Sequence, residues 1–92
     1  MRVLVIYDIS DDDSRTKLAD DLKRLGLTRI QRSAFIGNIT AATVKEISRV
    51  CSHRARGEDD IVHIVPLCDY DWRKSIVIGK PMNEYGGDVQ VV

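Results

Sequence analysis

The order of its apolar segments is the feature that most constrains the fold of this 92-residue chain. Residues 2–8 form a short β-branched run, apolar at successive positions, which predicts a strand buried on both faces. Leu18, Leu22 and Leu25 follow at helical spacing, with Lys and Asp side chains on the opposite face. Gly26 then ends this predicted helix.

The same alternation continues through the middle of the chain. Residues 27–38 predict a strand region whose phase shifts near Arg32 and Ser33, so a tight turn or bulge divides it into two short strands. Thr40 can cap a second helix that runs to about Arg54. The apolar stripe of this helix comprises Val44, Ile47, Val50 and Cys51.

Three more short strands are predicted in the last third of the chain, at residues 61–68, 75–79 and 89–92. Pro66 has no backbone N–H to donate, which places the end of the first of them at a sheet edge or bulge. The complete order is β-α-β-β-α-β with one or two extra C-terminal strands. This order predicts an α+β, ferredoxin-like fold with two helices on one face of an antiparallel sheet.

A single domain, residues 1–92, accounts for this length. With both helices on one face, the other face of the sheet needs a partner. We therefore expect a two-fold homodimer in which the C-terminal segment, about residues 76–92, crosses to the partner protomer.

Charged residues are distributed unevenly along the chain. Fourteen basic and fourteen acidic residues give a formal net charge of zero, which by itself argues against a nucleic-acid-binding protein. Residues 23–56, however, carry eight basic residues against Glu46 alone, and the segments on either side are acidic. Such a region can attract phosphate; the alternative is a solvated surface with charged helix faces.

Cysteine content and hydropathy narrow the classes of protein further. Cys51 and Cys68 form no CxxC pair, so we expect neither a disulfide framework nor a zinc site. Both are interpreted as small buried side chains in a cytoplasmic protein. The longest apolar run, residues 3–7, is far below the ~20 residues that span a bilayer, so no membrane association is expected.

Asp8 is the most informative candidate for chemistry, because a carboxylate directly after a strand is held on a rigid element at the sheet edge. Asp11, Asp12 and Asp13 follow it closely, and a divalent cation would relieve their mutual repulsion. One Asp8 from each protomer, paired across a two-fold axis, would supply a Mg²⁺ site. The alternative is that Asp8 caps a turn. No nucleophilic triad, glycine-rich phosphate loop or HExxH motif is found in the sequence.

Four segments, residues 5–15, 26–35, 64–68 and 76–79, together resemble the second Cas protein, the small protein of the CRISPR adaptation module. The resemblance implies a ferredoxin-like homodimer whose C-terminal strands cross between protomers. It also implies a metal-dependent phosphodiesterase activity on RNA or duplex DNA, with Mg²⁺ or Mn²⁺ as the cofactor. A further implied role is to bridge dimers of the CRISPR integrase, the first Cas protein, and to hold protospacer DNA.

Site residues follow from the same resemblance. The metal-binding aspartate of the family falls on Asp8, and the implied catalytic set is Asp8, Tyr7, Arg15 and Ser33. The implied nucleic-acid-binding set is Arg15, Lys17, Arg29, Arg32 and Phe35. Lys17 stands where some relatives have Arg, and Arg32 stands where an aromatic residue is frequent. Phe35 has an alternative interpretation, as an aromatic residue of the core.

Two functions of different class remain open from the sequence. The first is a metal-dependent endonuclease acting in spacer acquisition for antiviral defence, on RNA or on DNA. The second is a non-catalytic homodimeric scaffold for the integrase. Both need the basic middle of the chain, but only the first needs Asp8.

Overall fold

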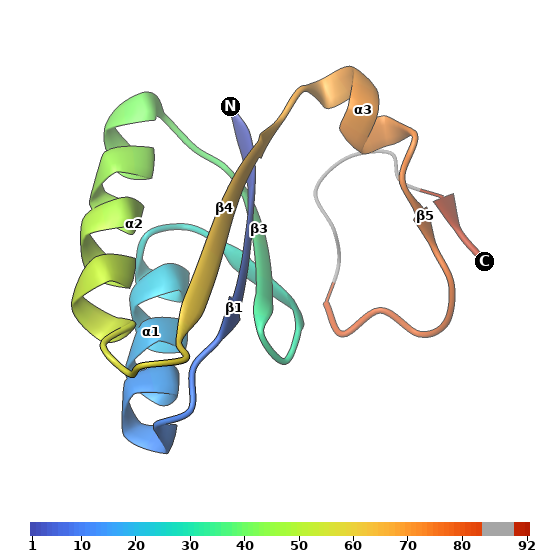
Figure 1. Cartoon of the computed structure of the whole chain (residues 1–92). Helices are drawn as coiled ribbons and strands as arrows, with labels where there is room; N and C mark the ends of the chain where they lie inside the picture. The colour runs from blue at the N-terminus through green and yellow to red at the C-terminus, as the bar shows by residue number, and fades with distance from the viewer. Residues whose placement is uncertain (84–89) are drawn as a thin grey trace.

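The computed structural model describes residues 1–83 and 90–92. Strands and helices follow one another in the predicted order from the start of the chain to residue 67 (Figure 1). The elements are β1 (Arg2–Asp8), α1 (Asp12–Arg24), β2 (Thr28–Gln31), β3 (Ala34–Asn38), α2 (Ala41–Arg54), β4 (Ile61–Leu67), α3 (Asp69–Arg73), β5 (Ile76–Val77) and β6 (Gln90–Val91).

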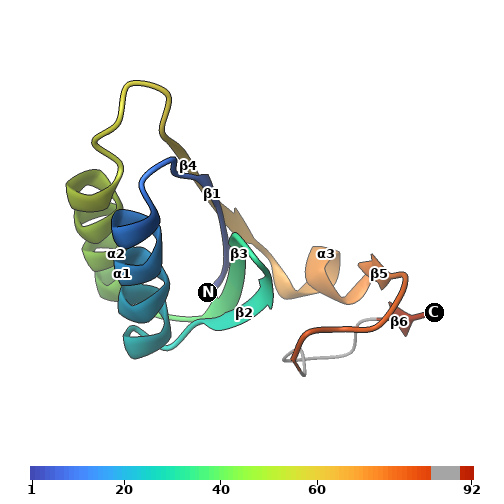
Figure 2. The same cartoon turned by 90° about the horizontal axis from the view of Figure 1, so that it is seen from below.

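Four strands form the main sheet in the order β2-β3-β1-β4, and every neighbouring pair is antiparallel. Two βαβ units therefore interleave, which is the ferredoxin-like arrangement predicted from the sequence. Helices α1 and α2 lie side by side over one face of this sheet (Figure 2). Strand β4 lies at the edge, where Pro66 is tolerated, as predicted.

Local capping fixes where each helix begins and ends. The backbone N–H of Ser14 donates to the Asp11 side chain at 2.8 Å, and that of Thr43 donates to Thr40 Oγ1 at 3.2 Å. Gly26 follows α1 with φ of 98°, a left-handed conformation that glycine adopts without a steric penalty. The predicted caps of α2 and end of α1 are thereby confirmed.

The core lies between the two helices and the sheet. Alternate residues of β1 (Val3, Val5 and Tyr7) are buried on the helix-covered side. Ile6 points to the other side and is 42% exposed. The prediction that this strand is buried on both faces is wrong, because the described chain covers only one face of the sheet.

The predicted break in the second strand region is confirmed. Strands β2 and β3 are joined by a two-residue turn at Arg32 and Ser33, and their register shifts between Arg29 and Gln31. The turn is tied to the centre of the sheet, since the backbone N–H of Tyr7 donates to the Ser33 carbonyl at 3.0 Å.

The chain beyond β4 departs from the sequence predictions. Helix α3 was not expected, because five residues are too few to display a helical period. Its N-cap is Cys68, whose Sγ accepts from the Asp71 backbone N–H at 3.4 Å. Cys68 is therefore exposed, contrary to prediction, whereas Cys51 is buried as predicted.

Strands β5 and β6 form a small parallel pair apart from the main sheet (Figure 1). Two predicted strands correspond to this pair, although Val89 lies outside the described residues. The expected crossing of residues 76–92 to a partner stays a prediction. No helix in the described part of the chain is both long and apolar enough to traverse a bilayer.

Candidate functional site

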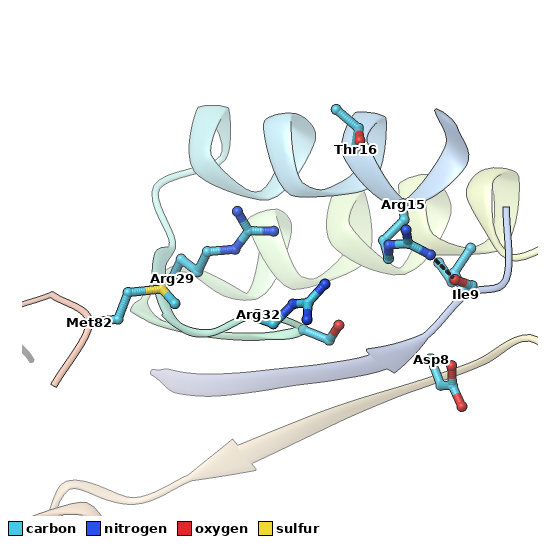
Figure 3. Close-up of a pocket in the computed structure, with 8 residues that line it drawn as sticks. Asp8, Ile9, Arg15, Thr16, Arg29, Arg32 and Met82 are labelled. Carbon is cyan, nitrogen blue, oxygen red and sulfur yellow. Dashed lines mark hydrogen bonds between the residues drawn. The ribbon is translucent and has the colours of Figure 1, made fainter. Parts of the chain in front are cut away.

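A cleft of about 580 Å³ lies where the start of α1, the end of β1 and the β2–β3 turn meet. Figure 3 shows three arginines around it, one each from α1, β2 and the β2–β3 turn. The residues lining it are Asp8, Ile9, Arg15, Thr16, Arg29, Arg32, Ser33 and Met82. The cleft therefore brings together five of the residues that the sequence analysis selected: Asp8, Arg15, Arg29, Arg32 and Ser33.

Arg15 is fixed in the cleft by two contacts. Its Nη1 donates to the Ile9 carbonyl at 2.9 Å, and its Nη2 forms an ion pair with Asp12. A cation in the first turn of a helix opposes the helix dipole, so helix stability alone does not account for an arginine here. The two contacts hold the guanidinium at the cleft wall.

Arg29 reaches the cleft from β2. Its guanidinium carbon lies 5.3 Å from the centre of the Phe35 ring, a cation–π contact. Its Nε is buried and has no hydrogen-bond partner among the described residues. The Nη groups of Arg29 form no hydrogen bond or ion pair with a described residue, so they are the donors that remain for an anionic oxygen.

Arg32 occupies the first position of the β2–β3 turn and is exposed. Its side chain makes no ion pair or hydrogen bond with any residue that the structure describes. Ser33 beside it is half-buried and lines the same cleft. This end of the cleft therefore presents a free guanidinium next to a hydroxyl group.

Asp8 is exposed at the end of β1. In Figure 3 its carboxylate points to the opposite side of β1 from Arg15 and Thr16. Within residues 1–83 and 90–92, Asp8 forms no ion pair and its side chain accepts no hydrogen bond. It is therefore a free carboxylate at the rim of the cleft.

The other acids of this segment have local partners. Asp11 caps α1, and the backbone and side-chain hydrogen bonds from Ser14 lower the pKa of Asp11. Asp12 pairs with Arg15, and Lys17 Nζ lies 2.9 Å from Asp13. A cation is therefore not needed to relieve repulsion within this acidic segment, contrary to the expectation from the sequence.

The donor set for a metal ion is small. No group of three or more His, Cys, Asp or Glu side chains with suitable geometry occurs in the part of the chain that the structure describes. A free carboxylate is nevertheless the type of ligand that Mg²⁺ prefers, and Mg²⁺ commonly binds through one or two carboxylates with several waters. Asp8 thus fits as one ligand, and the site would be incomplete in a single chain.

Tyr7 and Phe35 lie in the core beneath the cleft. Their ring centres are 6.2 Å apart, and their side chains are 4% and 0% exposed. A ring with no accessible surface cannot stack on a base, so the structure favours the alternative interpretation of Phe35 as an aromatic residue of the core. Phe35 instead packs against the Arg29 guanidinium group through the cation–π contact. Tyr7 Oη lies 3.5 Å from the Arg32 carbonyl and positions the turn.

Lys17 lies outside the cleft, on the exposed side of α1, where it pairs with Asp13. Thr16 and Met82 also line the cleft, although neither was predicted from the sequence. Asn83 Nδ2 donates to the Arg29 carbonyl at 2.7 Å and holds the segment that carries Met82 against β2. No periodicity or motif indicates this contact, because it joins residues 54 positions apart.

Comparison with known proteins decides the family. Residues 1–75 match the family described as CRISPR associated protein Cas2. The chain belongs to the Cas2 family. All the cleft residues named above except Met82 lie within the matched part.

Individual relatives agree with this Cas2 assignment. The CRISPR-associated endoribonuclease Cas2 of Korarchaeum cryptofilum is 41% identical over 80 residues, which cover 87% of this chain and 86% of that protein. A CRISPR-associated endonuclease Cas1/endonuclease Cas2 fusion of Thermoproteus tenax is 47% identical over 57 residues, covering 62% of this chain and 22% of the fusion. The crystal structure of Streptococcus pyogenes Cas2 at pH 6.5 shares the fold, with a TM-score of 0.69 at 23% identity over 79% of this chain and 93% of that chain.

Proposed function

We propose that this protein is a metal-dependent endonuclease that hydrolyses phosphodiester bonds of RNA or duplex DNA during CRISPR spacer acquisition. The observation that carries the proposal is the meeting of Arg15, Arg29 and Arg32 in one cleft, with the free carboxylate of Asp8 at its rim. The names of the Cas2 relatives, endoribonuclease and endonuclease, support a nuclease.

A homodimer would complete the metal site. The uncovered sheet face carries the exposed apolar side chains of Ile6, Ile61 and Val65, which is a surface suited to a second copy of the chain. Asp8 follows Ile6 by two positions and therefore lies on the same face of β1. A two-fold contact across this face would let two Asp8 carboxylates share one Mg²⁺ or Mn²⁺ ion.

The C-terminal segment supports this dimer. Ile76, Ile78 and Val92 are 61%, 83% and 69% exposed, so apolar side chains of this segment lack cover in a single chain. Packing of this segment on the partner protomer would bury them.

Each group in the cleft has a role in this proposal. Asp8 from each protomer would hold a divalent ion, which would supply an activated water and polarise a phosphodiester oxygen. Arg15, Arg29 and Arg32 hold backbone phosphates and stabilise the charge that develops during the attack. Ser33 orients a water, and Tyr7 keeps the β2–β3 turn in place through the Arg32 carbonyl.

Replacing Asp8 tests the nuclease directly. We expect Asp8→Asn to lower cleavage of RNA and DNA by at least about 100-fold, because it removes a metal ligand and the charge it carries. Chelation of divalent ions should have the same effect on the unaltered protein. Asp20→Asn is the matched control, since Asp20 is an exposed acid on α1 away from the cleft. Unchanged cleavage by Asp8→Asn would exclude Asp8 from the reaction.

A second candidate function is a non-catalytic scaffold that bridges the Cas1 integrase and holds protospacer DNA. Two observations favour it: a relative that joins Cas1 and Cas2 in one chain, and a metal donor set of one carboxylate. A scaffold predicts that Asp8→Asn still supports spacer integration with Cas1. Replacing both Arg29 and Arg32 with Glu should abolish integration under either function, because both functions need the phosphate contacts.

A further inference from the structure

Asp21 is a charged side chain at a core position of α1. Leu18, Leu22 and Leu25 form the apolar stripe of this helix, and Asp21 lies on the same stripe, at the spacing i+3 from Leu18. It is 4% exposed, and it is the single buried charged residue among those described. The prediction that the aspartates of this helix lie on its solvent face is wrong for Asp21.

Two arginines neutralise this buried carboxylate. Arg54 Nε, at the end of α2, donates to Asp21 Oδ2 at 2.9 Å, and Arg24 forms an ion pair with Oδ1. A buried ion pair contributes little to stability compared with an apolar residue of similar size. The arrangement does, however, hold two guanidinium groups from different helices side by side at the protein surface.

These arginines belong to a groove of about 210 Å³ between α1 and α2 (the helices are seen side by side in Figure 2). The groove is also lined by Arg49 and His53, which are one helical turn apart on α2, and by Glu46. Arg49 pairs with Glu46 and is 69% exposed. Three arginines thus outnumber the two acids, Asp21 and Glu46.

Donors remain available in this groove. A guanidinium has five N–H donors, and Arg54 uses only its Nε on Asp21, while Arg24 uses only one Nη group. The described residues take up no other donor of these two side chains. Guanidinium groups fixed in this way match the geometry of a phosphate, which accepts paired hydrogen bonds.

We propose that this groove, defined by Arg24, Arg49, His53 and Arg54 and organised by Asp21, is a second phosphodiester-binding site for a nucleic-acid backbone. It lies in the helical layer and shares no residue with the cleft of Arg15, Arg29 and Arg32. It also accounts for basic residues of the middle segment that the cleft does not use. The choice of a nucleic acid as the ligand rests on the proposed function.

Salt-dependent binding of a duplex tests the groove. The probe is a labelled duplex of about 20 base pairs, roughly 68 Å long at 3.4 Å per step, in the presence of a chelator so that it stays intact. The variant Arg24→Gln/Arg49→Gln removes two groove charges and leaves Arg54 to pair with Asp21. The control Lys23→Gln/Lys45→Gln removes the same charge from exposed positions outside the groove.

We expect the groove variant to bind more weakly and to reduce the slope of log affinity against log salt by about 2. The control should bind almost as the unaltered protein does. If the double variant has a lowered melting temperature, the single variant Arg49→Gln replaces it in the binding measurement. Its expected change in slope is about 1. Equal binding by the groove variant and the control would overturn the proposal.

Two further arms identify the ligand and separate the two sites. Competition by polyglutamate as strong as that by unlabelled duplex would assign the groove to acidic protein segments and overturn the nucleic-acid assignment. Arg29→Gln/Arg32→Gln reports on the cleft alone. If only this cleft variant loses affinity, the groove proposal fails and the proposed function stands. If only the groove variant loses affinity, the groove proposal stands and the phosphate-binding role that the proposed function gives to the cleft fails.

Discussion

The backbone N–H of Ser10 donates to the carboxylate of Asp60 at 3.0 Å, across 50 positions of the chain. Ser10 Oγ donates to the same oxygen at 3.2 Å, and the Gly57 N–H donates to the other carboxylate oxygen at 2.8 Å. Asp60 thus joins the loop before β4 to the loop after β1. Because Asp8 ends β1 two residues before Ser10, this contact fixes the segment that presents Asp8.

Removing this contact should disturb the candidate site, although Asp60 does not line the cleft. We expect Asp60→Ala to lower the melting temperature and to raise the Mg²⁺ concentration needed for half-maximal cleavage, because the segment after Asp8 loses its anchor. Asp60→Asn retains an acceptor for Ser10 and should recover most of both. An unchanged Mg²⁺ requirement in Asp60→Ala would show that the anchor does not position Asp8.

Acid should destabilise the protein through the same group. Backbone hydrogen bonds from Ser10 and Gly57 lower the pKa of Asp60 from its ordinary value of 3.8. A lowered pKa contributes stability above pH 3.8, and this contribution is lost as the pH falls through the folded-state pKa. Asp11 and Glu46 are shifted in the same direction and add to the effect.

Thermal unfolding between pH 6 and pH 2, reported by circular dichroism, measures this loss. Asp60→Asn removes one of the three titrating groups, so its melting temperature should change less steeply below about pH 4. A curve parallel to that of the unaltered protein would contradict this assignment.

Phe35 should contribute to the free energy of unfolding more than to contact with nucleic acid. Phe35→Ala is expected to cost about 3–5 kcal/mol of unfolding free energy, because it empties a fully buried ring position. Phe35→Leu keeps most of the volume and should cost much less, but it removes the ring under Arg29. Denaturant unfolding gives the free energies. Nucleic-acid affinity of Phe35→Leu should then fall only as far as that of Arg29→Gln.

Arg32, unlike Phe35, should contribute to nucleic-acid binding more than to stability. Its exposed side chain forms no ion pair or hydrogen bond with the described residues, so Arg32→Ala is expected to change stability by no more than about 0.5 kcal/mol. The same substitution should reduce the salt dependence of nucleic-acid binding by about one unit of slope. Lys45→Ala, which removes an exposed cation outside the cleft, is the matched control. Equal effects of the two substitutions would mean that the cleft has no special role in binding.

The two cysteines should differ in reactivity. Burial raises the pKa of the Cys51 thiol to about 11, whereas Cys68 is exposed. Iodoacetamide at about pH 8 should therefore alkylate Cys68 alone in the folded protein and both cysteines after denaturation. Intact-mass measurement before and after denaturation distinguishes these products. Modification of Cys51 in the folded state would show that α2 opens readily.

Much of the fold follows from local patterns, which is why it could be predicted. The spacing of Leu18 and Leu22 fixes one helix, Thr40 begins the other, and the phase shift at Arg32 divides β2 from β3. Each of these signals lies within a few residues of the feature that it determines. The ferredoxin-like order then follows from the sequence of elements.

The parts that were missed depend on distant residues. Asp21 is tolerated at a core position because Arg54, 33 residues later, reaches back to it. Phe35 has no accessible surface because it lies in the core cluster that contains residues of both helices. No local pattern in the sequence indicates how complete this burial is. The arginines of the cleft were found from their family resemblance and charge, but their fixed orientations come from contacts such as that between Arg15 and the Ile9 carbonyl.

The arginines of the cleft and those of the groove form two separate basic clusters on a chain whose formal net charge is zero. Its net charge of zero gives no overall attraction to a polyanion, so long-range encounter depends on which side of the molecule faces the strand. The arginine clusters would be drawn toward the strand, so that the field of the nucleic acid orients the protein before any contact forms. Such a chain should adhere to a heparin column at neutral pH, where its overall charge alone would let it pass through.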